Sequence, residues 1–196
     1  GVKALADILR GAVNPSGKLP FSFPAKLTDC GAHAFEELSY PGDSIKQEYK
    51  EDILVGYRWH DTKEIPALFP FGHGLSYTTF TYGKPVASAK AMAADGTLTV
   101  TVAVKNTGSI AGKEIVQLYV GDDKCSVLRP VKELKHFAKV GLAPGEEKSV
   151  TFTLTPDDLK FYDEASAAWK YEPGKFKAYV CASSADVRGV VPFEMQ

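Results

Sequence analysis

The chain has 196 residues, of which 44% are hydrophobic and 24% are charged, a composition typical of a soluble globular protein. Its formal net charge of −1 gives no electrostatic reason to expect nucleic acid or an anionic membrane as a partner. No apolar run approaches the roughly 20 residues that cross a bilayer. We therefore expect no nucleic-acid partner and no membrane partner.

The three cysteines, Cys30, Cys125 and Cys181, are widely spaced and form no Cys-x-x-Cys pair. Their spacing predicts neither a zinc site nor a redox motif. Three free thiols packed as small apolar groups are favoured, and one disulfide with a leftover thiol stays open. We expect no metal and no cofactor.

Residues 2–10 have the apolar spacing of a helix with one buried stripe. The stripe consists of Ala4, Leu5, Ile8 and Leu9. Gly11 stands where a left-handed C-terminal cap is expected. No Ser, Thr, Asp or Asn precedes the helix as an N-cap, which suggests a domain cut through its end.

A turn and a short strand are predicted next. Asn14-Pro15-Ser16-Gly17 favours a turn, and residues 18–23 follow as a short strand. Pro20 within it and Pro24 after it place this strand at a sheet edge. One helix and one strand cannot form an independent α/β domain. Residues 1–24 are therefore interpreted as the last unit of such a domain.

Residues 25–67 show weak periodicity and mixed polarity, which predicts an unusually long structureless stretch. It is too apolar for a free linker. The apolar side chains in question are Tyr49, Ile53, Leu54, Val55, Tyr57 and Trp59. We expect residues 25–75 to wrap against another part of the protein, with these side chains at the interface.

From Thr79 onward, apolar and polar residues alternate with period two between turn signals. Strands are predicted at residues 80–82, 98–104, 115–120, 134–140, 150–154, 176–180 and 190–193. Thr155-Pro156-Asp157-Asp158 predicts a short helix between two strands. The predicted fold is mainly β: an immunoglobulin/fibronectin type III-like β-sandwich over residues 76–196, after an α/β remnant and a wrapping segment.

An ordered run of motifs resembles glycoside hydrolase family 3, of the β-glucosidase type. Its most specific member is Pro70-Phe71-Gly72-His73-Gly74-Leu75-Ser76-Tyr77-Thr78, which in that family leads from the second α/β domain into a fibronectin type III-like sandwich. The other motifs lie at residues 6–20, 55–63, 105–108, 111–120, 129–134, 142–146 and 171–174. The resemblance covers most of the chain.

This resemblance implies hydrolysis of β-linked glucosides or related glycosides with retention of configuration. That reaction takes two carboxyl groups about 5–5.5 Å apart. The family's nucleophile is an aspartate in an N-terminal barrel, and its acid/base is usually a glutamate in the second domain. No position here matches either one, so no catalytic residue is assigned. The implied partners are the missing N-terminal catalytic domains, which we expect this chain to brace.

Four side chains are candidates for contact with a sugar or with another domain. Tyr57, Arg58 and Trp59 have the chemistry to stack on a sugar ring or to anchor a domain interface, and the interface is favoured. His73 stands between two glycines with no Ser or Cys nucleophile paired to it by spacing. A hydrogen-bonded structural histidine is favoured there over a general base.

Two other groups of residues imitate glycosidase chemistry. Lys135-His136-Phe137 resembles a Lys-His pair with which the family holds sugar hydroxyls, but it lies in a predicted sandwich strand, which disfavours that role. The acids of residues 36–61 are expected to be solvated, although a glycosidase pair could be drawn from them. They are Glu36, Glu37, Asp43, Glu48, Glu51, Asp52 and Asp61.

Two alternative functions stay open. The chain could be a stand-alone carbohydrate-binding or adhesion module, in which Trp59 and Trp169 would be the aromatic residues to test. It could also be one half of a split glycosidase. In that case an apolar surface would promote pairing with a catalytic piece or with a second copy of the chain.

Overall fold

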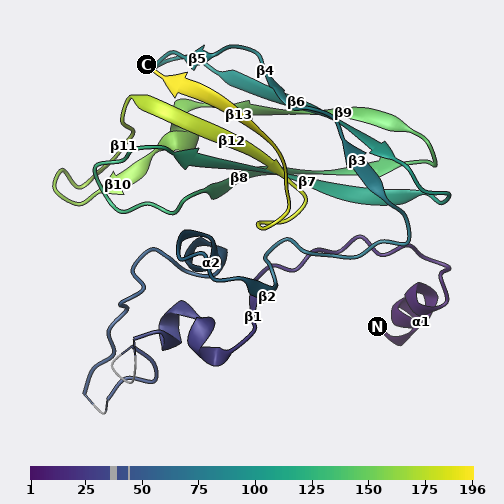
Figure 1. Cartoon of the computed structure of the whole chain (residues 1–196), viewed down its shortest axis with the longest axis horizontal. Helices are drawn as coiled ribbons and strands as arrows, with labels where there is room; N and C mark the ends of the chain where they lie inside the picture. The colour runs from purple at the N-terminus through teal and green to yellow at the C-terminus, as the bar shows by residue number, and fades with distance from the viewer. Residues whose placement is uncertain (36–38, 44) are drawn as a thin grey trace.

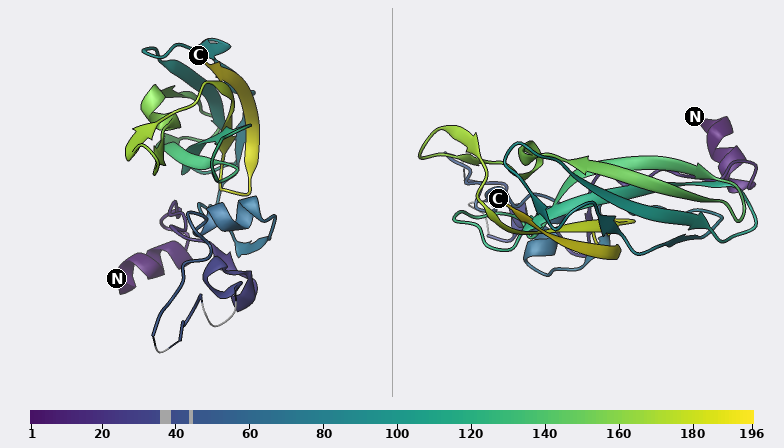
Figure 2. Two further views of the ribbon diagram at one scale, coloured as in Figure 1. Left: turned by 90° about the vertical axis from the view of Figure 1, so that its left-hand side faces the viewer. Right: turned by 90° about the horizontal axis from the view of Figure 1, so that it is seen from above.

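The computed structural model describes residues 1–35, 39–43 and 45–196. Residues 79–196 form two packed β-sheets, and residues 1–77 lie along one side of them (Figure 1). Seen end-on, the N-terminal residues form a separate layer under the sheets (Figure 2). None of the described helices has the length and apolarity that crossing a membrane takes.

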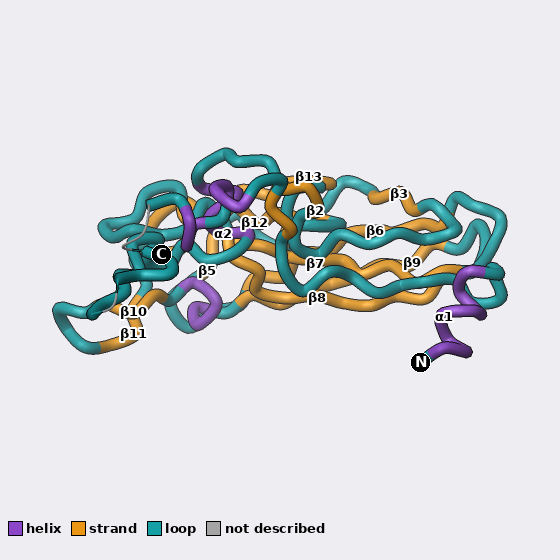
Figure 3. The backbone as a smooth tube through the Cα atoms, turned by 90° about the horizontal axis from the view of Figure 1, so that it is seen from below, coloured by secondary structure: helices purple, strands orange, loops and turns teal. Residues whose placement is uncertain are grey.

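The N-terminal layer contains little regular structure, and most of its backbone is loop (Figure 3). Its helices are α1 (Val2–Leu9), α2 (Tyr57–Thr62) and two 3-10 turns, Leu27–Asp29 and Gly31–His33; its strands are β1 (Phe23–Pro24) and β2 (Ala67–Phe69). β1 and β2 pair with each other, antiparallel.

The sandwich consists of one five-stranded sheet and one four-stranded sheet. The larger sheet has the order β5 (Ala91–Met92), β13 (Val187–Met195), β12 (Gly174–Cys181), β7 (Gly112–Asp122) and β8 (Glu133–Leu142). In the smaller sheet β6 (Leu98–Asn106) pairs with β3 (Phe80–Tyr82), β4 (Val86–Ala87) and β9 (Glu147–Leu154). A hairpin of β10 (Phe161–Asp163) and β11 (Ala168–Lys170) stands outside both sheets.

The hydrophobic core lies between the two sheets. Alternate residues of β6, from Leu98 to Val104, face Val116, Leu118 and Val120 of β7, and all of them are buried. This alternation is the signal from which the strands were predicted, and each of the seven predicted strands is present. The predicted mainly β, fibronectin type III-like sandwich is therefore confirmed.

The predicted short helix after β9 is also present, as a 3-10 turn at Pro156–Leu159. The backbone N–H of Thr155 donates to the Asp158 carboxylate at 2.8 Å, which closes the first turn. Lys135-His136-Phe137 lies in β8 as expected, with His136 paired opposite Leu118 of β7.

Three predictions for residues 1–67 need correction. The first helix is present, but Leu5 and Leu9 are exposed because no described residue covers them. The strand predicted at residues 18–23 is reduced to Phe23–Pro24. Pro20 has no backbone N–H to donate, so a longer strand would lack one hydrogen bond of the sheet ladder. The stretch predicted as structureless contains α2, which was missed because it has only six residues and Gly56 in place of a polar N-cap.

Asn106, at the end of β6, links Thr78, which lies just before the first sandwich strand, to three loops and strand ends of the sandwich. Its side chain is completely buried. Its Oδ1 accepts from the Thr78 hydroxyl at 2.6 Å and from the Gly108 N–H at 3.0 Å. Its Nδ2 donates to the carbonyls of Ile110 and Leu142, at 2.8 and 3.1 Å. Such a fully satisfied buried amide is costly to remove, because its partners lose their bonds without gaining water.

We therefore expect Asn106→Ala to lower the free energy of unfolding by about 3 kcal/mol. Lys105→Ala, on the exposed neighbouring position of the same strand, should change it by less than about 1 kcal/mol. Urea unfolding followed by circular dichroism measures both. An alanine variant at 106 that is as stable as the Lys105 variant would contradict this assignment.

Candidate functional site

The joint is the contact between α2 with residues 71–73 on one side and β7 with residues 131–134 on the other. β7 is covered on both faces, by the core on one and by the N-terminal layer on the other. Gln117 points to the joint and is 3% exposed. Its Nε2 donates to the carbonyls of Ala182 at 2.9 Å and of Gly72 at 3.3 Å, while its Oε1 accepts from the Tyr119 hydroxyl at 2.6 Å.

Gly72 is the residue of the Phe-Gly-His-Gly motif that approaches Gln117. Its φ of +79° is unfavourable for a side chain, and a Cβ there would collide with the Gln117 amide. The same turn is tied to the N-terminal segment by two backbone bonds of 2.8 Å, from Gly72 to Leu19 and from Leu19 to His73. The motif thus binds the Leu19 segment through its backbone and contacts the sandwich through the Gly72 carbonyl and the Gln117 side chain.

Tyr57 and Arg58 both reach the sandwich from α2. The Tyr57 ring lies 5.0 Å from Phe71 and 5.5 Å from Tyr119, and its hydroxyl accepts from the Leu134 N–H at 2.8 Å. Arg58 Nη2 lies 3.1 Å from Glu133 Oε1. These two side chains hold the N-terminal layer to the sandwich within the chain.

Trp59 points the other way, into the N-terminal layer. Its ring is buried, and its indole N–H donates to the Asp29 carbonyl at 3.1 Å. Phe35 packs on it edge-on at 5.5 Å, and Gly31 lies so close that a Cβ there would press on the ring. Trp59 therefore has no open face for a sugar in this structure.

His73 is half-buried and stacks on the Phe69 ring with the centroids 5.7 Å apart. Its carbonyl, not its imidazole, makes the bond to Leu19. Of the four predicted contact residues, Tyr57 and Arg58 share the joint, and His73 reaches it through its backbone. Trp59 does not.

Charged groups complete the joint. Lys132 and Asp61, both largely buried, pair at 2.6 Å. Burial raises the pKa of the Asp61 carboxyl above its ordinary value, although the Lys132 ammonium favours the ionised form. Asp61 is thus a structural partner and not a solvated acid, contrary to the expectation for that group.

The remaining acids of residues 36–61 are scattered. Glu51 is buried and accepts from the Ser39 hydroxyl at 3.4 Å, so the prediction that it is solvated is also wrong. Asp43 caps the backbone of Ile45 and Lys46, each at 2.7 Å. Glu48 pairs with Lys46, and Asp52 is exposed. Glu36 and Glu37 lie outside the described residues.

Glu133 is the centre of an ion cluster at the edge of the joint. Arg129 lies 2.9 Å from it, Arg58 3.1 Å and Lys135 3.5 Å. Burial opposes ionisation of Glu133, but Lys135, Arg129 and Arg58 together outweigh it and hold its pKa below the ordinary value. Neither this cluster nor Gln117 was predicted, because a polar residue in an alternating strand usually faces water.

The N-terminal layer also has many large apolar side chains in contact with solvent. Leu9 is 74% exposed and Val2 is 86% exposed. The other exposed apolar residues of this layer are Leu5, Val13, Phe21, Phe23, Leu27, Tyr40, Ile45, Tyr49, Ile53, Val55, Leu68, Phe69, Leu75 and Tyr77. Exposed apolar area on this scale is typical of an interaction surface.

A separate cleft of about 530 Å³ lies between the 52–58 region and the β10–β11 hairpin. Trp169 and Tyr162 line it, edge to face with 5.7 Å between their centroids, and both are exposed. Arg58 and Glu133 reach its wall from the joint. Trp169 is thus open to solvent, in contrast to Trp59.

Replacing the central acid of the ion cluster tests its contribution. We expect Glu133→Gln to lower the free energy of unfolding by about 2 kcal/mol at neutral pH, because the largely buried cations Arg129 and Lys135 lose their counter-charge. A lowered pKa stabilises the fold above the ordinary value of 4.5, and that stabilisation is lost as the pH falls through the folded pKa. The unfolding free energies of the wild type and the variant should therefore approach each other as the pH falls below 4.5.

Urea unfolding between pH 7 and pH 3 measures this convergence. Glu147→Gln, at an exposed position of β9, is the matched control and should track the wild type throughout. A stability gap between wild type and Glu133→Gln that does not narrow as the pH falls below 4.5 would show that charge is not the cause.

Two family models match the chain. Residues 1–77 match the glycosyl hydrolase family 3 C-terminal domain, and residues 114–184 match the fibronectin type III-like domain. The first match includes α1, α2 and the motif at the joint. The second covers the centre of the sandwich.

Curated relatives are similar over almost the whole chain. "Beta-glucosidase BoGH3A" of Bacteroides ovatus is 66% identical over 194 residues, which are 99% of this chain and 26% of that protein. "Thermostable beta-glucosidase B" of Acetivibrio thermocellus is 52% identical over 94% of this chain and 24% of its own length. The chain spans about a quarter of the length of these relatives.

Solved structures agree with these matches. DesR, a beta-glucosidase from Streptomyces venezuelae solved in complex with D-glucose, superposes with a TM-score of 0.91 at 42% identity. It covers 99% of this chain, which corresponds to 24% of DesR. Beta-glucosidase 3B from Thermotoga neapolitana gives a TM-score of 0.85 at 37% identity. The chain therefore belongs to glycoside hydrolase family 3 and corresponds to the C-terminal region of its β-glucosidases.

Proposed function

We propose that the whole protein hydrolyses β-glucosides and that this chain is its non-catalytic brace. The relatives of similar sequence and structure are β-glucosidases by name, which supports the activity of the whole protein. No position of the chain matches either catalytic carboxylate of the family, so catalysis falls to other parts of the enzyme.

The observation that carries the bracing role is the exposed apolar surface of residues 1–77. These residues match the C-terminal domain model of the family, and their apolar side chains face solvent in the isolated chain. Catalytic domains that cover this surface would gain about 25 cal/mol for each Å² of apolar area buried. The partner we propose for this surface is therefore the N-terminal catalytic domains.

Within this function we divide the chain into three parts. Residues 1–24 complete the second, α/β domain of the enzyme. Residues 25–75 wrap between the domains, and residues 76–196 are the sandwich that anchors the wrapping segment through the joint. Tyr57, Arg58 and the His73 backbone would act as anchors between domains and not as sugar contacts.

The purified chain should not hydrolyse an aryl β-glucoside, since it lacks both catalytic carboxylates. Release of the aryl group, compared with a heat-denatured sample of the same chain, measures this. The Bacteroides ovatus relative is the positive control. Turnover that stays with the chain through purification would contradict the non-catalytic role.

The bracing role predicts binding to the N-terminal part of the Bacteroides ovatus relative, produced without its last quarter. Leu9→Glu should weaken this binding at least about tenfold, because a charge would then be buried in the apolar contact. Val190→Glu, at an exposed position on β13 of the sandwich, is the matched control and should bind as the wild type does.

Binding is measured by calorimetry, with light scattering to detect self-association of the chain through the same apolar side chains. Equal binding by Leu9→Glu and the wild type would show that the catalytic domains do not use this surface.

A further inference from the structure

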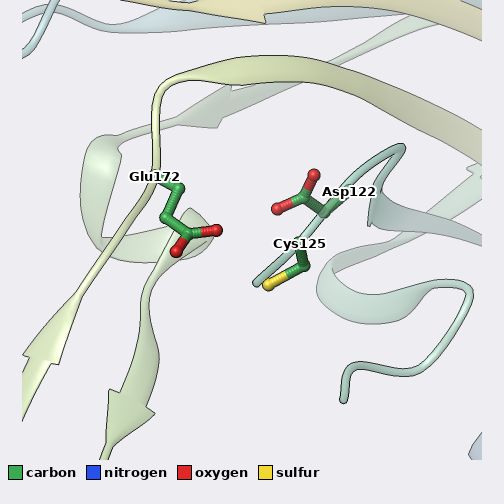
Figure 4. A group of neighbouring side chains, drawn as sticks. All are labelled: Asp122, Cys125 and Glu172. Carbon is green, nitrogen blue, oxygen red and sulfur yellow. The ribbon is translucent and has the colours of Figure 1, made fainter. Parts of the chain in front are cut away.

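Three side chains with metal-ligand chemistry meet at the end of the sandwich. Asp122 ends β7, Cys125 follows in the loop toward β8, and Glu172 lies in the turn before β12. Both loops leave the sheet at the same end, because Asp122 pairs opposite Phe176 of β12. One ligand atom from each of the three lies within 4.8 Å of the other two. Figure 4 shows their side chains converging.

Asp122 has a buried oxygen without a hydrogen-bond donor. Its side chain is only 3% exposed, and its Oδ2 atom accepts no hydrogen bond. Arg129 Nη1 lies 3.6 Å away, beyond hydrogen-bond distance, while Oδ1 is satisfied by the Lys124 N–H at 3.0 Å. A buried acceptor left unsatisfied destabilises the folded chain. A cation bound beside it would remove that cost.

The Glu172 carboxylate is already oriented by its neighbours. The Ser126 N–H donates to Oε2 at 3.0 Å, and the Ser126 hydroxyl donates to Oε1. The Cys125 thiol lies beside the same carboxylate, with its sulfur within 4.8 Å of a Glu172 carboxylate oxygen. Ligating carboxylates are held in this way by outer hydrogen bonds in metal sites. In a metal complex the thiol proton would leave, and the metal would take its place.

We propose that Asp122, Cys125 and Glu172 bind one zinc ion, with water as the fourth ligand. A thiolate and two carboxylates carry three negative charges, of which zinc neutralises two and Arg129 lies close enough to balance the third. The sulfur ligand favours zinc over calcium and magnesium, which take oxygen ligands. Ligand atoms in a tetrahedral zinc site lie about 3.5 Å apart, so the side chains would draw together by about 1 Å.

No zinc site was predicted from the sequence, because this site contains only one cysteine. Its two carboxylates are separated by a long stretch of chain, and only the pairing of β7 with β12 brings them together. An ion there would tie the β7–β8 loop to the turn before β12. The same loop carries Arg129, which contacts Glu133 at the joint.

Cobalt binding tests the proposal, since a thiolate bound to Co²⁺ absorbs in the near ultraviolet. The chelator-treated chain is titrated with Co²⁺ and then with Zn²⁺. We expect one Co²⁺ per chain, with a thiolate charge-transfer band that Zn²⁺ removes by displacement. Zn²⁺ should also raise the midpoint of thermal unfolding, because it binds the folded chain.

The variants Cys125→Ser and Glu172→Gln should weaken Zn²⁺ binding at least about tenfold, and Cys125→Ser should lose the band. Cys125→Ser exchanges one atom, so its fold should survive, as its circular dichroism spectrum would show. Cys30→Ser is the matched control and should bind as the wild type does. Absence of the band in the wild type, or its persistence in Cys125→Ser, would overturn the proposal.

Discussion

The buried amide of Gln117 sets the position of the N-terminal layer on the sandwich. It stands on a strand that is covered on both faces, so each of its polar groups must find a partner in the protein. One partner is the Gly72 carbonyl, which reaches it only because position 72 has no side chain. Leu19 is then fixed against Gly72 and His73, and α2 is fixed through Tyr57. The geometry of the layer depends on this contact.

Polar contacts and apolar surface have different roles in this layer. Hydrogen bonds and ion pairs, such as that of Lys132 with Asp61, join the layer to the sandwich in one orientation. The larger apolar side chains, Leu9 and Phe69 among them, face outward. The polar contacts are directional and fix the conformation of the layer on the sandwich, whereas burial of its apolar surface is not directional. This combination fits a bracing role, because the surface is already ordered when the catalytic domains bind it. The zinc site would stiffen the loop that carries Arg129 and Lys132.

The sandwich could be predicted from the sequence because each long strand of it buries one side, as in Leu98 to Val104 of β6. The N-terminal layer could not, since its order comes from contacts distant in sequence. Leu19 makes isolated bonds to residues 72 and 73, and α2 is too short to show a period. Family resemblance located the motif at residues 70–78, but its physical reason, the approach of Gly72 to Gln117, became visible only in the structure. Gln117 itself gave no signal, because half-buried strands alternate polar and apolar residues in the same way.

Native-state hydrogen exchange on the isolated chain tests the central claim, that the joint holds the N-terminal layer on the sandwich without the catalytic domains. The informative amides are those of Leu19 and Gly72, which donate to His73 and Leu19 within the layer at the joint, and that of Leu134, which donates to Tyr57 across the joint. The account predicts that they are protected, and that Gln117→Ala lowers their protection while the β6–β9 ladder keeps its own. Exchange of these three amides at the rate of an unfolded peptide, with the sandwich still protected, would contradict it.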